Sequence, residues 1–139
     1  RNREIFYSPW RRSLRPLRGI LHATFTFTMG AILFERLSSW AATGKAALTD
    51  QQILRARFRS LEEIASVRYS LRDLAYAADR LGWLTAAGRS LVGELARQIA
   101  RVERKIAPFR AAVMRSRYGP ALRRHVQELE KARKTYGRI

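Results

Sequence analysis

The chain has 139 residues, enough for one domain, and its 28 basic and 11 acidic side chains give a net charge of +17. Such a charge indicates polyanionic surroundings: RNA, DNA, anionic lipid or the acidic face of a larger complex. All but four of the basic residues are arginine, which suits contacts to phosphate and carboxylate, although a GC-rich coding sequence also favours arginine. The absence of cysteine excludes disulfides, thiolate metal sites and cysteine nucleophiles.

Residues 1–18 form a basic N-terminal arm with six arginines and one acidic residue. Pro9 and Pro16 disfavour helix before them, so we expect an irregular segment. The first residue is not Met and the arm resembles the end of a mitochondrial presequence, so we expect a processed mitochondrial protein. Lipid headgroups or another polyanion are the expected contacts of the arginines on both sides of the next segment: Arg11, Arg12, Arg15, Arg18 and Arg36.

Residues 19–34 form the longest stretch of the chain without formal charge. As a helix, these sixteen residues span roughly 24 Å, against about 30 Å for the hydrocarbon core of a bilayer. Residues 19–37 reach further if Arg18 and Arg36 extend towards the headgroups. Our working interpretation is a single membrane span. Its small residues Ala23, Thr26 and Gly30 would pack against neighbouring membrane helices.

Two other interpretations of this uncharged segment stay open. Threonines alternate with Phe25, Phe27 and Met29, which is the period of a strand, but nothing else in the chain is typical of a partner strand. An uncharged run shorter than about 18 residues is also typical of a helix buried in a protein core. His22 suits a hydrogen bond to a neighbouring subunit better than a haem or quinone contact.

A loop is expected over residues 38–48, and a helical hairpin with a basic C-terminal helix and tail over residues 49–139. Thr49 and Gln52 have the spacing of a capping box, and apolar residues at steps of three or four predict a helix to about Leu84. Such a helix is too long for a compact small domain, so it predicts a projecting arm or one half of a hairpin. The turn is expected at residues 82–88.

The second helix of the hairpin carries an apolar seam at alternating steps of three and four, which is a heptad pattern. Its members are Val92, Leu95, Ile99, Val102, Ile106, Phe109 and Val113. Pro108 lies inside the pattern and predicts a kink. A short basic helix then begins near Pro120. The expected fold is therefore all-α: one short hydrophobic helix, a long antiparallel hairpin and a short C-terminal helix.

The sequence predicts no catalysis and no metal or cofactor site. Its two histidines, His22 and His125, lie far apart, and no spaced set of His, Asp and Glu accompanies them. The adjacent carboxylates Glu62 and Glu63 diverge by about 100° on a helix and cannot face one another. Bound phospholipid such as cardiolipin is the one non-protein component that we expect.

The first functional hypothesis is a non-catalytic accessory subunit of a large mitochondrial inner-membrane complex of oxidative phosphorylation, either the ATP synthase or a respiratory chain complex. Its partners would be other subunits of the complex and anionic membrane lipid. The alternative is an organellar (mitochondrial) ribosomal protein that binds rRNA through its arginine-rich arms. A free DNA- or RNA-binding helical module is less well supported, because no recognition-helix pattern is present.

Overall fold

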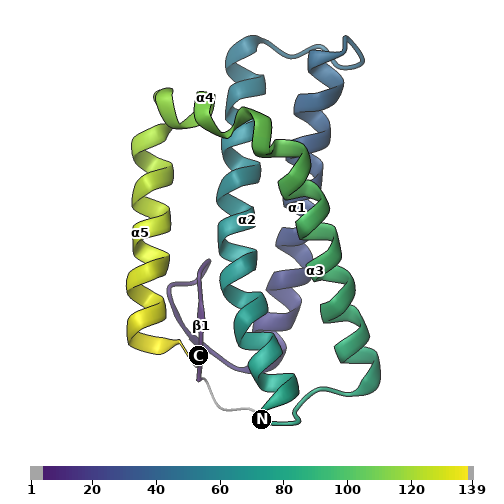
Figure 1. Cartoon of the computed structure of the whole chain (residues 1–139), viewed down its shortest axis with the longest axis vertical. Helices are drawn as coiled ribbons and strands as arrows, with labels where there is room; N and C mark the ends of the chain where they lie inside the picture. The colour runs from purple at the N-terminus through teal and green to yellow at the C-terminus, as the bar shows by residue number, and fades with distance from the viewer. Residues whose placement is uncertain (1–4, 138–139) are drawn as a thin grey trace.

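Helix α2 (Asp50–Asp79) is the centre of the fold, and the other long helices pack around it (Figure 1). The computed structural model describes residues 5–137, which are mostly helical. In chain order the elements are β1 (Phe6–Ser8), β2 (Ser13–Arg15), α1 (Leu17–Ala42), α2, α3 (Ala86–Ile106), the 3-10 turn η1 (Ala107–Phe109), α4 (Arg110–Arg115) and α5 (Gly119–Tyr136).

The predicted capping box begins α2, as expected. The Thr49 hydroxyl accepts a hydrogen bond from the Gln52 N–H at 3.1 Å, and the Gln52 side chain accepts one from the Thr49 N–H at 2.9 Å. The helix ends at Asp79, before the expected Leu84, because the chain turns through Gly82, whose φ is +63°. Thr85 then caps α3 by accepting a hydrogen bond from the Gly88 N–H.

The helix pair α2–α3 is not an isolated arm, which corrects that expectation. α1 lies along α2 and also contacts α3, and α5 packs on α2 from another side (Figure 1). Helix α1 therefore belongs to the same bundle. The main core holds Phe58, Ile64 and Val67 of α2 with Leu95 and Ile99 of α3.

The N-terminal arm is folded where it was expected to be irregular. β1 and β2 form an antiparallel hairpin in which Phe6 pairs with Arg15 and Ser8 with Ser13. Phe6 is fully buried in a second core cluster with Leu17, Ile20 and Leu74, and this burial holds the hairpin on the bundle. Two three-residue strands are too short for a period-two pattern to be visible in the sequence. Residues 1–4 of the arm and the last two residues of the tail lie outside the described part of the chain.

The first helix is longer than residues 19–37. It begins at Leu17 and runs to Ala42, so the first five residues of the expected loop 38–48 are helical. The alternative of a strand over residues 23–29 is wrong, because this stretch lies inside α1.

Pro108 changes the direction of the chain more than a kink would. The helix stops at Ile106, the 3-10 turn η1 contains the proline, and α4 leads across one end of the bundle to α5 (Figure 1). The expected seam is thereby interrupted at one position. Phe109 is 37% exposed, whereas Ile106 and Val113 on either side of it are buried.

Candidate functional site

From Thr24 to Ser38, the buried residues of α1 are small or polar. Thr24 and Thr28 are fully buried, and each hydroxyl donates to a carbonyl of the preceding turn at 2.7 Å. Ala31 is also fully buried, and its carbonyl accepts a hydrogen bond from the Ser60 hydroxyl of α2 at 3.0 Å. These small side chains let α1 approach α2 closely over its middle turns, while Leu17 and Ile20 at its start are buried in the second core cluster.

The outer face of α1, as we name the stripe Phe25, Met29, Leu33 and Trp40, is apolar and exposed. These four side chains are 45%, 40%, 52% and 44% exposed, respectively. Phe25, Met29 and Leu33 follow one another at steps of four, and Trp40 lies two turns further on, so they lie along one side of the helix. Large apolar residues exposed along one side of a helix mark an interaction with lipid or protein, and the exposed Arg36 lies on the same side between Leu33 and Trp40.

Helix α1 is long and apolar enough to cross a bilayer, and 28% of the residues in its most apolar stretch are buried by the rest of the chain. Of the three residues expected to pack against neighbouring membrane helices, Ala23 and Gly30 are half-buried and Thr26 is exposed. A Cβ atom added at Gly30 would meet no heavy atom within 4 Å. Within this chain, Gly30 is therefore not needed for a close helix approach.

The expected lipid-contacting arginines lie near the two ends of α1. Arg11 and Arg15 line a pocket of about 450 Å³ with His22, Ala23 and Thr26 near the N-terminal end. Arg36 lines a pocket of about 510 Å³ near the C-terminal end. The rise from Arg18 to Arg36 is roughly 27 Å, close to the thickness of a hydrocarbon core. Arg12 instead pairs with Glu128 of α5 at 3.4 Å.

The pocket near the C-terminal end of α1, which we call the C-terminal pocket, contains two cations that were not predicted from the sequence: Arg57 of α2 and Lys105 of α3. The Arg57 guanidinium lies 3.6 Å from the centroid of the Phe109 ring, and burial lowers its pKa from the ordinary value. No pattern in the sequence brings Arg57 and Lys105 together, because the fold, not their spacing, makes them neighbours.

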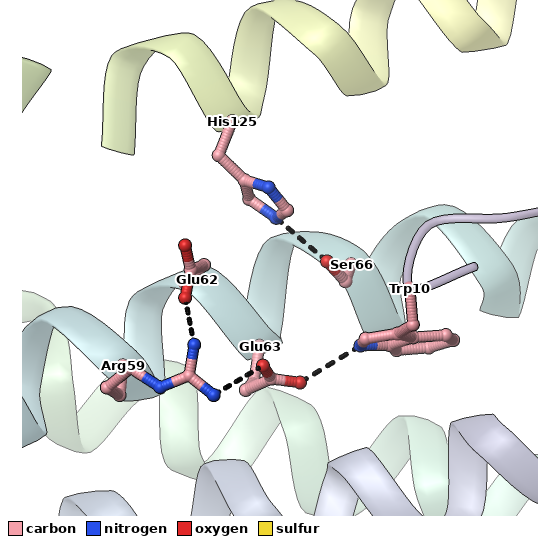
Figure 2. Close-up of polar contacts among 6 residues, drawn as sticks. All are labelled: Trp10, Arg59, Glu62, Glu63, Ser66 and His125. Carbon is pink, nitrogen blue, oxygen red and sulfur yellow. Dashed lines mark hydrogen bonds and ion pairs between the residues drawn. The ribbon is translucent and has the colours of Figure 1, made fainter. Parts of the chain in front are cut away.

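A charged network on α2 lies beside the inner side of α1 (Figure 2). The Trp10 indole N–H donates a hydrogen bond to Glu63 Oε2 at 3.0 Å. The Arg59 guanidinium donates to the Glu62 carboxylate and lies 3.4 Å from Glu63 Oε1. Burial raises the pKa of the Glu63 carboxyl, against the opposing effects of Trp10 and Arg59. A bilayer around the whole bundle would enclose these charges at high cost, so only the outer side of α1 suits lipid.

The apolar seam packs inside the chain. Leu95, Ile99, Val102, Ile106 and Val113 are buried, and Val92 is partly buried against the core clusters. These residues of α3 and α4 join the core instead of facing another protein. Among residues 5–137, no group of three His, Cys, Asp or Glu residues is placed to hold a metal ion.

Comparison with known proteins found no matching family model, no similar curated protein and no similar solved structure. The features of the chain that suit a binding surface are the outer face of α1 and the cationic pockets near the two ends of this helix.

Proposed function

We propose that the protein is a non-catalytic structural subunit of a large mitochondrial inner-membrane complex, the ATP synthase or a respiratory chain complex. In this role the outer face of α1 lies against lipid, and the remaining helices contact neighbouring subunits. The observation that carries the proposal is the exposed apolar stripe Phe25, Met29, Leu33 and Trp40 on a chain of net charge +17.

Two features support a membrane position for this stripe. Cations gather near both ends of α1, where headgroups would lie, and Trp40 is placed where interfacial aromatic residues occur. The charged network around Glu63 and Arg59 disfavours lipid on that side of the bundle, which suits water or a neighbouring subunit. A subunit at the rim of a larger membrane complex meets both conditions. The choice of the mitochondrial inner membrane rests on the basic N-terminal arm.

The test is alkaline carbonate extraction of native membranes. We expect the wild-type chain to stay in the membrane pellet and a Met29→Glu/Leu33→Glu variant to be released, because two charges on the outer face would enter hydrocarbon. Ala111→Glu/Ala112→Glu, at exposed positions of α4, adds the same charge away from α1 and should stay in the pellet. Circular dichroism of each variant checks the helical fold. Release of the wild-type chain would contradict the proposal.

The second candidate is an organellar ribosomal protein, favoured by a separate group of cations. Arg101, Arg104, Arg110, Arg115 and Arg117 are exposed at the end of α3, in α4 and just after it, and the ion pairs found among residues 5–137 involve none of them. Such an exposed cationic surface suits phosphate contacts, whose strength falls steeply with salt. Co-sedimentation with ribosomal particles that ribonuclease abolishes would favour this candidate over the first.

A further inference from the structure

The C-terminal pocket is built by three helices and the 3-10 turn η1, which meet at one end of the bundle. Most residues between Glu35 and Ala42 of α1 line it. α2 contributes Arg57, the end of α3 contributes Lys105, and η1 contributes Phe109. The volume is about 510 Å³, enough for a small ligand or the polar part of a larger one. Trp40 and Phe109 add aromatic surface to its lining.

The charge of the pocket favours an anion. Arg36, Arg57 and Lys105 bring three cations and Glu35 one carboxylate, so the lining carries a net charge of +2. The ion pairs found among residues 5–137 involve none of these three cations. Arg57 lies over the Phe109 ring and its Nε atom has no hydrogen-bond partner within the described residues, so no carboxylate of the chain neutralises this cation.

Two backbone carbonyls of α1 at the pocket are already hydrogen-bonded within the chain. The carbonyl of Ser39 accepts a hydrogen bond from the Thr43 N–H at 3.1 Å, and that of Trp40 accepts one from the Lys45 N–H at 2.7 Å. The hydroxyl of Thr43 donates to the same two carbonyls. The helix therefore ends with these acceptors already bonded.

The pocket continues into the outer face of α1, because Trp40 belongs to both and Leu33 lies one turn before Arg36. A ligand with a phosphate and an apolar body fits this combination, since the phosphate meets the cations and the apolar part follows the exposed stripe. Neither inorganic phosphate nor a nucleic acid backbone would use Leu33 and Met29.

We propose that this pocket binds the phosphate headgroup of an anionic phospholipid, with Arg36, Arg57 and Lys105 as its cationic contacts and the acyl chains along the outer face of α1. The inference rests on the proposed function, because it takes the stripe to face lipid. It adds a defined site and names Arg57 and Lys105, from two other helices, as part of it.

The experiment is a calorimetric titration of the purified full chain with short-chain phosphatidylglycerol, kept below its micelle concentration. We expect the variant Arg36→Gln/Lys105→Gln to lose at least about tenfold in affinity for this lipid, because it loses two charge-assisted phosphate contacts. Arg80→Gln/Arg124→Gln removes the same charge at exposed positions outside the pocket and should bind like wild type. Circular dichroism confirms that each variant is folded.

Three further titrations distinguish the ligand classes. Inorganic phosphate and short-chain phosphatidylcholine should bind far more weakly than the anionic lipid. A single-stranded RNA oligonucleotide that binds more tightly than the lipid, and loses its affinity in the pocket variant, would overturn the assignment in favour of nucleic acid. Equal lipid affinity of wild type and pocket variant would also overturn it, while carbonate retention of the wild-type chain would leave the proposed function intact. Lipid binding at the pocket by a chain that carbonate releases would contradict the function and not the site.

Discussion

At the scale of single residues, two buried carboxylates on α2 differ in how well nearby cations and hydrogen-bond donors compensate for their loss of water. Asp73 is 1% exposed, and the Arg133 guanidinium of α5 donates to it at 2.7 Å while lying over the Tyr69 ring. Glu63 is also buried, but its partners are an indole N–H and an arginine 3.4 Å away. Burial outweighs these partners, and the pKa of Glu63 is raised.

The raised pKa of Glu63 predicts a specific pH dependence of stability. The folded chain holds this proton more tightly than the unfolded chain, so the contribution to stability is fully present below the ordinary pKa of 4.5 and is lost as pH rises through the folded value. Glu63→Gln keeps an acceptor for the Trp10 indole and removes the titrating group. We expect the unfolding free energy of wild type, relative to this variant, to fall as pH increases from 4.5 to 7, as measured by urea denaturation.

A control is needed because any Glu→Gln change alters the net charge. Glu130 is exposed on α5, and Glu130→Gln removes one carboxylate without touching the network around Trp10. The unfolding free energy of this variant against pH gives the general effect of losing one carboxylate, which is subtracted from the result for Glu63→Gln. A Glu63→Gln profile parallel to that of wild type across this pH range would show that Glu63 is compensated by its partners.

At the scale of the elements, substitution by alanine should change the unfolding free energy in opposite directions at two glycines. Gly30 lies inside α1 with no heavy atom near an added Cβ, so Gly30→Ala should raise the unfolding free energy by about 0.5–1 kcal/mol through helix propensity. Gly119 begins α5, and its added Cβ would lie 2.0 Å from the Met114 carbonyl oxygen, so Gly119→Ala should cost about 1–3 kcal/mol. Urea denaturation of the two variants measures both signs.

The Gly30 variant also tests the role in neighbour packing that the sequence predicts. If a partner helix approaches α1 at Gly30, the alanine variant will be more stable as an isolated chain and will assemble less completely in native gels of the complex. Destabilisation of the isolated chain by Gly30→Ala would instead contradict the open space around this residue.

The sequence was informative where local signals decide the structure. The capping box at Thr49 and the helical spacing after it predicted the start and type of α2. The extension of α1 through Ser38 and Ser39 was not predicted, because small polar residues are common in loops and the burial of Ser38 is a tertiary contact. The β1–β2 hairpin was missed for the same reason, since the burial of Phe6 against Leu74 is a long-range contact.

The candidate site was predictable only in part. The sequence selected the cations at both ends of the uncharged segment, but it could not select the face of α1 that turns outward. Hydrophobic pattern alone favours burying Phe25, Met29 and Leu33, whereas the structure buries Thr24, Thr28 and Ala31. The pocket with Arg57 and Lys105 depends on how three helices meet, which a single sequence does not reveal.

At the scale of the whole molecule, the net charge of +17 opposes compact folding through self-repulsion. The ion pairs found among residues 5–137 are mostly exposed, and pairs of that kind contribute about 0–1 kcal/mol each. Repulsion among the remaining cations should therefore dominate the response to salt. This imbalance is expected of a chain whose surroundings supply the missing anions.

The corresponding prediction concerns the isolated chain in sodium chloride. Raising the salt from about 0.01 M to 0.1 M shortens the screening length from about 30 Å to about 10 Å, which weakens repulsion in the folded state more than in the expanded one. The urea midpoint of unfolding should rise over this range. A midpoint that falls would mean that the ion pairs outweigh the repulsion. In sodium sulfate at equal ionic strength, a further rise in the midpoint that the Arg36→Gln/Lys105→Gln variant lacks would indicate an anion held in the C-terminal pocket, because the general stabilisation by sulfate raises both chains alike.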